Sequence, residues 1–224
     1  MNPRRRRWLI PGLLIALIVV VAVASLVDRA GAATVSTGDR PYVVLSDPRI
    51  TESSGLAVSA ADPGLAYTVN DSGGAAEIYA VDLTDGSVVG VTRLRTGFVD
   101  VEALALADGT LWIADVGDNA ATRDDAALLA IDEPGRTSRT VDAERYPVAI
   151  EGGPADVEAL LADPASGRLY AVTKGLLTGS VLAVPTDLRT DRTNTLTVVA
   201  DGMPGLVTDG SFSPDGSRVA LLTY

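Results

Sequence analysis

The segment Asp100-Val101-Glu102-Ala103-Leu104 recurs letter for letter as Asp156-Val157-Glu158-Ala159-Leu160, 56 positions later. A turn sequence rich in Asp and Gly follows each copy, and after it comes an apolar run with one aromatic residue, at residues 111–115 and 169–173. Short apolar runs separated by Gly, Asp and Pro are typical of β-strands joined by turns. An identical segment at a fixed place in this pattern predicts a chain built from repeated sheets.

The same template fits twice more along the chain. Residues 52–57 lead through a turn to residues 66–70, and residues 212–216 lead to residues 219–222. Further strands are expected between these motifs, at residues 77–82, 88–94, 128–131, 180–184 and 196–199. From Tyr42 onward no segment has the 3.6-residue periodicity of an amphipathic helix. The body of the chain is therefore predicted to be all-β.

Four copies of a strand–turn–strand–loop–strand–turn–strand unit, about 50 residues apart, are typical of β-propeller blades. One small sheet cannot cover both of its faces, so such sheets stack side by side. The prediction is a partial β-propeller of about 3.5 four-stranded blades, preceded by one N-terminal hydrophobic helix. A β-sandwich of regular hairpins is the alternative, which the five-residue identity disfavours.

The sequence ends at Tyr224, within the fourth repeat. About 3.5 blades would form an open arc with two unpaired sheet edges, which soluble proteins avoid. We therefore expect the chain to be an incomplete ring, truncated from a longer propeller. A six-bladed ring at this period would need roughly 100 more residues. A partner chain that completes the ring is the alternative.

The N-terminus has the pattern of an export signal or a membrane anchor. Four arginines, residues 4–7, precede residues 8–27, which carry no charge and as a helix would span the about 30 Å of a bilayer core. The arginines predict that the following residues lie outside the cytoplasm. Small residues at positions 30–33 favour a cleaved signal peptide, whereas the length of the apolar run favours a retained anchor.

The predicted organisation is therefore a signal peptide or membrane anchor at 1–33, a linker at 34–41 and propeller blades at 42–224. The predicted location of these blades is extracytoplasmic, either anchored to the membrane through the N-terminal helix or secreted.

Composition excludes several classes of function. The chain has no cysteine and no histidine, so disulfides, zinc–thiolate sites, cysteine nucleophiles and Ser-His-Asp triads are excluded. The formal net charge is -11, and residues 34–224 carry 13 basic and 28 acidic side chains. Such an acidic surface repels nucleic acid, so no nucleic-acid partner is expected.

Several motifs carry a resemblance to a known group. They are Glu52-x-Ser54-Gly55-Leu56-Ala57, Asn70-Asp71-Ser72-Gly73, Asp100-x-Glu102-x-Leu104-Ala105, and Asp115-Val116-Gly117-Asp118-Asn119 with Arg123. Together they resemble secreted bacterial six-bladed propellers related to the TolB-like and NHL-repeat superfamily, over residues 42–224. The wider superfamily includes metal-dependent lactonases, phytase-like esterases and binding scaffolds. The resemblance therefore implies a fold and leaves the activity open.

Acidic residues of the repeats are expected to lie around one opening of the central channel. These candidates for the channel rim are Glu52, Asp100, Glu102, Asp156, Glu158 and Asp209, and Asn70, Asp71, Asp115 and Lys174 are further candidates there. Carboxylates are the ligands that calcium prefers, and a bound calcium ion would polarise a carbonyl or phosphoryl group. The alternative is structural, in which these side chains cap strand ends and accept hydrogen bonds from backbone amides. Glu102 and Glu158 are the first candidates for metal ligands.

Two loops rich in Asx and Gly occupy equivalent places in two repeats. They are Asn70-Asp71-Ser72-Gly73-Gly74 and Asp115-Val116-Gly117-Asp118-Asn119. Such loops either ligate calcium or bond to their own backbone in turns, and both possibilities stay open. Lys174, the single lysine, lies where the second repeat has Val116, so it is either a substrate-orienting cation at the channel or a solvated loop residue.

The preferred interpretation is an extracytoplasmic propeller that binds an unidentified small molecule or protein across its channel face. One alternative is a calcium-dependent hydrolase acting on an ester, lactone or phosphoester. A second alternative is an inactive, truncated fragment. The serines lack any histidine to activate them, so a serine hydrolase is not expected.

Overall fold

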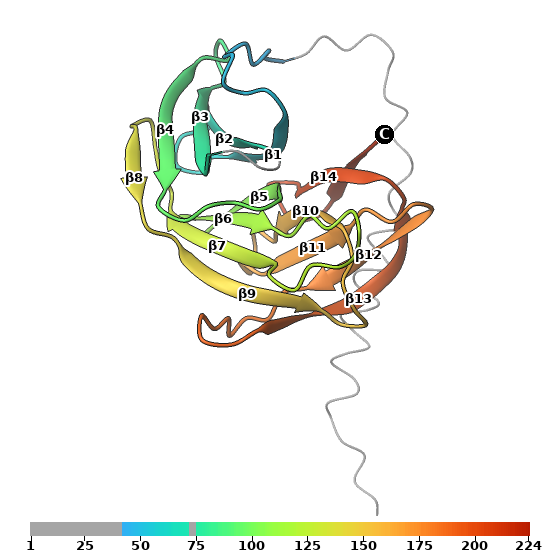
Figure 1. Ribbon diagram of the computed structural model, residues 1–224. Helices are drawn as coiled ribbons and strands as arrows, with labels where there is room; N and C mark the ends of the chain where they lie inside the picture. The colour runs from blue at the N-terminus through green and yellow to red at the C-terminus, as the bar shows by residue number, and fades with distance from the viewer. Residues whose placement is uncertain (1–41, 72–74) are drawn as a thin grey trace, which may run out of the picture. The chain divides into compact units, whose positions relative to one another are not determined.

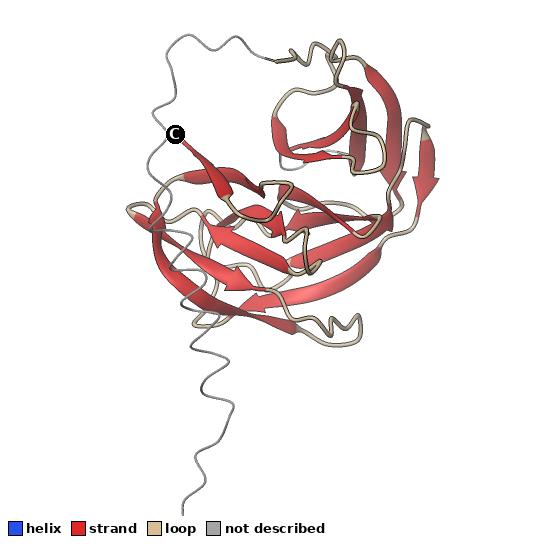
Figure 2. Ribbon diagram, turned by 180° about the vertical axis from the view of Figure 1, so that it is seen from behind, coloured by secondary structure: helices blue, strands red, loops and turns tan. Residues whose placement is uncertain are grey.

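The computed structural model describes residues 42–71 and 75–224. Within these ranges the chain forms strands joined by turns and loops (Figure 2). Nowhere in them is there a helix of sufficient length and apolarity to cross a membrane. The predicted N-terminal helix, the linker at 34–41, and Ser72, Gly73 and Gly74 of the first Asx-rich loop lie outside the described residues.

Three four-stranded antiparallel units and one hairpin follow one another along the chain (Figure 1). We call them blades 1 to 4. Blade 1 contains β1 (Ser53–Val58), β2 (Leu65–Asn70), β3 (Glu77–Asp82) and β4 (Val88–Leu94). Blade 2 contains β5 (Val101–Ala107), β6 (Thr110–Asp115), β7 (Ala127–Asp132) and β9 (Glu144–Ile150). Blade 3 contains β10 (Val157–Ala162), β11 (Leu169–Thr173), β12 (Thr178–Ala183) and β13 (Asn194–Pro204). Blade 4 contains β14 (Val207–Phe212) and β15 (Val219–Thr223). The short β8 (Arg139–Val141) lies between β7 and β9 in the sequence. The all-β prediction and the four repeats are confirmed.

The hydrophobic cores lie between successive blades. Tyr67 and Ile78 of blade 1 pack with Leu104 and Ile113 of blade 2 in one buried cluster. A second cluster joins blades 2 and 3 and includes Leu128, Leu160 and Leu182, and a third joins blades 3 and 4. A strand with both faces covered is buried along nearly its whole length. The strands β2, β5, β7 and β10 have this burial pattern. This is the stacking that the repeat predicted, because no blade covers its own faces.

The first strands of the four blades surround a common centre. β5 packs beside β1 and β10, and β14 packs beside β10 and also contacts β1. The Asp209 carboxylate of β14 accepts a 2.7 Å hydrogen bond from Gly210 N and lines the same pocket as Leu56 of blade 1. The fourth hairpin thus contacts the first blade at the innermost strands, although it pairs with no strand of that blade. Farther out, Val58 of β1 and Leu222 of β15 are exposed.

The outer edges of the blades are joined by parallel pairing, which the sequence analysis did not predict. β9 pairs with β13, so that blades 2 and 3 share one eight-stranded sheet, and β8 pairs with β4 at the edge of blade 1. The buried Asn194 holds the first of these junctions, since its amide group donates 2.8 Å hydrogen bonds to Pro147 O and Arg189 O. The pairing supplies partners for edge backbone groups that would otherwise be unpaired.

A β-bulge recurs at the same place in all four innermost strands. The register shifts between Ser54 and Leu56, between Val101 and Ala103, between Val157 and Ala159, and between Val207 and Asp209. The extra residue is Gly55 in blade 1, Glu102 in blade 2, Glu158 in blade 3 and Thr208 in blade 4. A bulge redirects a side chain away from the regular alternation of a strand. The two repeated glutamates therefore occupy the redirected positions.

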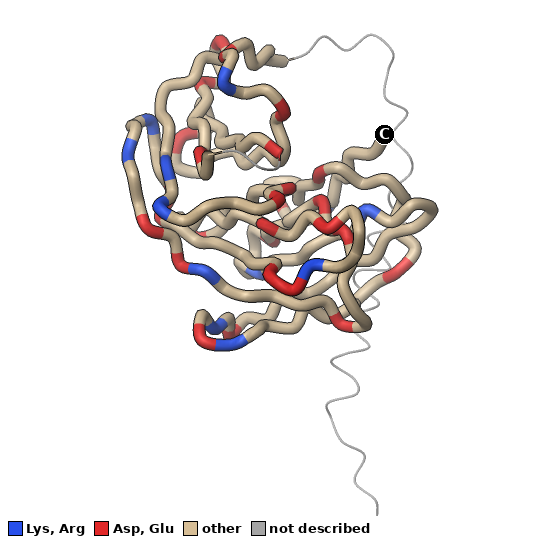
Figure 3. The backbone as a smooth tube through the Cα atoms, viewed as in Figure 1, with Lys and Arg blue, Asp and Glu red and all other residues tan. Residues whose placement is uncertain are grey.

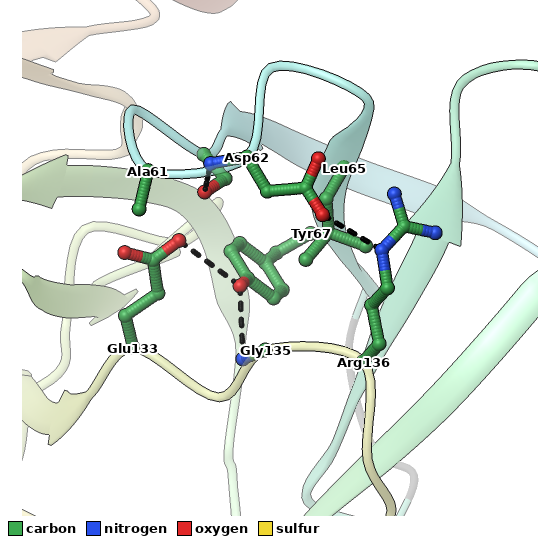
Figure 4. A pocket seen from close by; sticks show the side chains of 8 residues that line it. Ala61, Asp62, Leu65, Tyr67, Glu133, Gly135 and Arg136 are labelled. Carbon is green, nitrogen blue, oxygen red and sulfur yellow. Dashed lines mark hydrogen bonds and ion pairs between the residues drawn. The ribbon is translucent and has the colours of Figure 1, made fainter.

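A polar junction fastens blade 1 to blade 2 on the side of a cavity of about 280 Å³ (Figure 4). The hydroxyl of the buried Tyr67 donates to Glu133 Oε1 at 3.1 Å and accepts from Gly135 N at 3.0 Å. Burial raises the pKa of Tyr67 to about 12, so this hydroxyl keeps its proton. Arg136 beside it forms ion pairs with Asp62 and Asp82 of blade 1. The junction fixes how the first two blades meet.

Replacing Tyr67 by phenylalanine is expected to lower the free energy of unfolding by about 1–2 kcal/mol, because the amide of Gly135 loses its partner. Urea unfolding followed by tryptophan fluorescence measures this change. Tyr170→Phe is the matched control, since its hydroxyl makes no hydrogen bond with a described residue. Equal losses in the two variants would contradict the role given to the Tyr67 hydroxyl.

Candidate functional site

A pocket with a cavity volume of about 390 Å³ opens where the innermost strands of the blades meet. Acidic positions of the chain gather at this centre (Figure 3). Residues from all four blades line the pocket, among them Glu52, Asp71, Glu102, Asn119, Glu158, Lys174 and Asp209. The structure thus brings acidic side chains of different blades to one opening.

Two groups of three carboxylates lie at the base of this pocket. Asp71, Asp100 and Glu102 form the first group, and Glu102, Asp156 and Glu158 form the second. Within each group one oxygen from every residue lies within 4.8 Å of the others. Oxygens on opposite sides of a calcium ion, each about 2.4 Å from it, would be about 4.8 Å apart. Glu102 belongs to both groups, so the two groups adjoin.

Glu102 is the most constrained carboxylate of the pocket. Only 4% of the surface of Glu102 is exposed. Among described residues, its carboxylate accepts one hydrogen bond, from Ser54 Oγ, and that bond is long at 3.5 Å. Burial, aided by the charges of Glu158, Asp71 and Asp100, raises the pKa of Glu102 to about 8. An ionised Glu102 in this position would therefore lack a positive partner among the described residues.

Lys174 supplies the one cation of the second group. Its Nζ lies 2.5 Å from Glu158 Oε1 and 3.9 Å from Asp156 Oδ2. Glu158 is 5% exposed, and burial raises its pKa despite the opposing effect of the ammonium. The hydrogen bond to Glu158 in turn raises the pKa of Lys174, which stays charged. The side chain of Lys174 lines the central pocket and is 25% exposed.

The loop after β6 brings its backbone against the first group. A Cβ atom on Gly117 would lie 2.4 Å from Glu102 Oε1 and 2.5 Å from Asp100 Oδ2, so any larger residue there would displace the two carboxylates. Arg123 holds this loop, because it donates to Gly117 O at 2.7 Å and pairs with Asp115 at 3.0 Å. Burial raises the pKa of Asp100, and the charge of Asp71 adds to this effect.

The remaining Asx residues of the two loops mostly perform turn chemistry. The Asn70 side chain accepts from the amides of Thr51 and Glu52 and donates to Arg49 O. The side chain of Asp115 accepts from the amides of Val99 and Asp100, and that of Asp118 accepts from the amides of Thr122 and Arg123. These three side chains are directed at backbone and not at the carboxylate groups.

The other candidates are spread around the pocket. Asn119 and Glu52 are exposed and line its wall. Asp209, whose pKa is raised to about 6 by burial, lines the pocket from blade 4. Asp71 was predicted as a channel-rim candidate from its loop, and the structure places it in the first group, with a buried Oδ1 that has no partner among described residues. Gly117 was not predicted as a contact of the acids; its place in the repeated loop was the available signal.

Fold and pocket together define an all-β protein of propeller-like blades whose centre is acidic. No protein-family model and no curated protein matches the sequence. Among solved structures, the chain is similar to hydrazine synthase of Kuenenia stuttgartiensis, with 14% identity and a TM-score of 0.46 over 75% of this chain and 58% of that one.

Two further similarities are of the same order. An auxiliary nutrient binding protein of Bacteroides thetaiotaomicron matches with 13% identity and a TM-score of 0.43, over 77% of this chain and 36% of that one. The Cps50 (Swd1) β-propeller domain of Myceliophteria thermophila matches with 16% identity and a TM-score of 0.42, over 76% and 49%. The chain thus spans 58% and 36% of the first two proteins, and at these TM-scores the similarities carry no functional inference.

Proposed function

We propose that this protein is a ligand-binding domain whose central pocket holds one hard divalent cation, calcium in the first instance, between Asp71, Asp100 and Glu102. The observation that carries the proposal is the Glu102 carboxylate, 4% exposed and beside other carboxylates, with only a 3.5 Å hydrogen bond from a described residue. A buried charge is costly unless it is paired or coordinates a metal.

The donor set favours a hard cation. Every candidate ligand atom is a carboxylate oxygen, and the chain has no histidine or cysteine to favour zinc or copper. Calcium accepts six to eight oxygens in flexible geometry, so three carboxylates leave positions for water or for a ligand. The cavity of about 390 Å³ beside the carboxylates has room for both.

The bound ion would supply the binding activity of the pocket. A cation at its base, with coordination positions that face the opening, would hold an oxygen-rich small molecule or an acidic side chain of a protein partner. The proposal includes an extracytoplasmic location, supported by the arginines and the uncharged segment at residues 4–27. It also includes kinship with secreted six-bladed TolB-like and NHL-repeat propellers, supported by the motif string alone.

Calcium titration of the full chain, by calorimetry and by the shift of the melting temperature, tests the proposal. We expect saturable binding of one ion with a dissociation constant of about 10⁻⁵ to 10⁻³ M, the range between sensors and extracellular modules. Addition of a chelator is expected to reverse the thermal shift. Absence of saturable binding for calcium, magnesium and manganese would refute the proposal.

Replacing Gly117 by alanine is expected to lower calcium affinity about 10-fold or more without changing any charge, because the new methyl group would displace Glu102 and Asp100. Gly97→Ala is the matched control, since a Cβ there meets no atom within 4 Å. The same titration compares both variants with the parent chain. Unchanged calcium affinity in a folded Gly117→Ala protein would place the ion elsewhere.

A calcium-dependent hydrolase is the second candidate. The observation in its favour is that the carboxylate groups open into a pocket and are not sealed inside the fold. A cation there would polarise the carbonyl or phosphoryl group of a bound ester, lactone or phosphoester. Assays with these three substrate classes, each run with calcium and with chelator, test this candidate. Turnover that requires calcium and is lost in Glu102→Gln would show that the protein is a hydrolase. Absence of such turnover would favour the ligand-binding domain.

A further inference from the structure

The second carboxylate group has the same ligand types as the first and differs in one respect. It contains Glu102, Asp156 and Glu158, and their oxygens satisfy the same 4.8 Å limit. Two acids of the group, Glu102 and Glu158, are 4% and 5% exposed. In contrast with the first group, it already contains a positive charge, the ammonium of Lys174.

The ammonium of Lys174 lies beside two acids of the second group. It is 2.5 Å from Glu158 Oε1 and 3.9 Å from Asp156 Oδ2, while Asp156 Oδ1 accepts a 2.8 Å hydrogen bond from Asp118 N. Lysine is a compact point charge, so it can replace a metal ion as the counter-charge of a carboxylate pair. The side chain of Lys174 is itself 25% exposed, and its backbone amide is fixed by a 2.9 Å bond to Asp156 O.

The blades explain why only one group has this cation. Blades 2 and 3 both place a glutamate at the bulge, and blade 1 has Gly55 there. After the second strand of the blade, blade 1 supplies Asp71, blade 2 supplies the backbone of Gly117 and blade 3 supplies Lys174. The repeat therefore brings five carboxylates together, and the lysine neutralises those on one side only.

We propose that Lys174 is a built-in cation that occupies the Asp156–Glu158 side of the pocket. Because of this charge, the pocket binds one divalent ion and not two. Removal of the charge opens a second cation site. This rests on the proposed function for the first ion. Glu102, which belongs to both groups, would bridge the two ions in such a variant. Lys174 thus sets the number of ions that the pocket binds.

Equilibrium dialysis of the full chain against calcium chloride, with the ions per chain counted, tests the proposal. We expect one ion in the parent chain, two in Lys174→Met, and one in Lys174→Arg, which keeps the charge. The double variant Lys174→Met, Glu158→Gln is expected to return to one ion, because it removes a ligand of the second site. Lys174→Gln, which keeps a hydrogen-bond donor without the charge, replaces Lys174→Met if the latter does not fold.

The outcomes separate the two proposals. One ion in the parent and two in either folded neutral variant supports the role of Lys174. One ion in the parent and one in both neutral variants overturns that role and leaves the proposed function intact. Two ions in the parent overturn the role of Lys174 alone. No ion in the parent overturns the proposed function, and the role of Lys174 with it.

Discussion

Replacing Glu102 by glutamine is expected to lower calcium affinity by about 100-fold or more, because it removes the buried charge of the first carboxylate group. The same change is expected to stabilise the calcium-free protein at neutral and alkaline pH. Glutamine resembles the protonated form of Glu102, which the surroundings favour. Loss of binding together with a gain of stability distinguishes a functional carboxylate from a structural one.

The pH dependence of this gain follows from the raised pKa. Glu102 has a pKa of about 8 in the folded chain against an ordinary value of 4.5, so the folded chain holds this proton more tightly than the unfolded chain. Its contribution to stability is therefore present below pH 4.5 and is lost as the pH rises to 8. In the presence of chelator, the stability advantage of Glu102→Gln should be small at pH 5 and reach about 2–3 kcal/mol at pH 8.

Urea unfolding at several pH values measures this advantage, and calorimetry measures the affinity. Glu151→Gln is the matched control, because Glu151 is an exposed glutamate in a turn outside the pocket. A Glu102→Gln protein that is less stable at pH 8 and binds calcium like the parent would show that the acid serves the fold alone.

Replacing Gly55 by alanine is expected to destabilise the protein by about 3–5 kcal/mol, the largest effect on stability that we expect from any single substitution described here. Gly55 is the bulge residue of β1 and has φ of +71°. A Cβ there would lie 2.7 Å from Leu104 N and 2.9 Å from Ala103 Cα, which belong to the innermost strand of blade 2. Since these are backbone atoms, relief requires that two blades separate.

Gly109→Ala separates this contact from the cost of the backbone conformation. Gly109 has φ of +74°, and a Cβ there meets no atom within 4 Å. Its replacement is expected to cost about 1 kcal/mol, the conformational penalty alone. Urea unfolding of both variants measures the difference, and equal losses would show that the close approach of β1 to β5 is not a determinant of stability.

The strands and their repetition could be predicted because the signals are local. Alternating apolar residues and Asp-Gly turns predicted β3 and β4 with the bounds that the structure has. The identity of residues 100–104 and 156–160 predicted that their carboxylates occupy equivalent places, and the structure brings both pairs to one pocket. The parallel pairing of β9 with β13 has no such signal, because it depends on where two outer edges meet in space.

The assignment of roles among the acids required contacts between blades. Asp115 and Asp118 belong to a loop for which the sequence left two roles open, and in the structure Asp115 accepts hydrogen bonds from the amides before β5 while Asp118 accepts them from the amides of its own loop. Glu102 is the extra residue of a β-bulge, which the sequence pattern does not show. The bulge redirects its side chain into the pocket, because an extra residue interrupts the regular alternation of the strand.

The amino-acid order is sufficient to specify a β-rich repeat, an acidic body, and the absence of every histidine- or cysteine-based chemistry, since these depend on composition and on neighbours along the chain. The arrangement in space decides which carboxylates lie close enough to share a cation, which ones hold loops, and which acids the single lysine pairs with. These roles depend on separations of a few ångströms between residues of different blades. Electrostatic energy varies steeply over such distances in a buried site. Residues that are distant along the chain come this close to one another only when the blades stack.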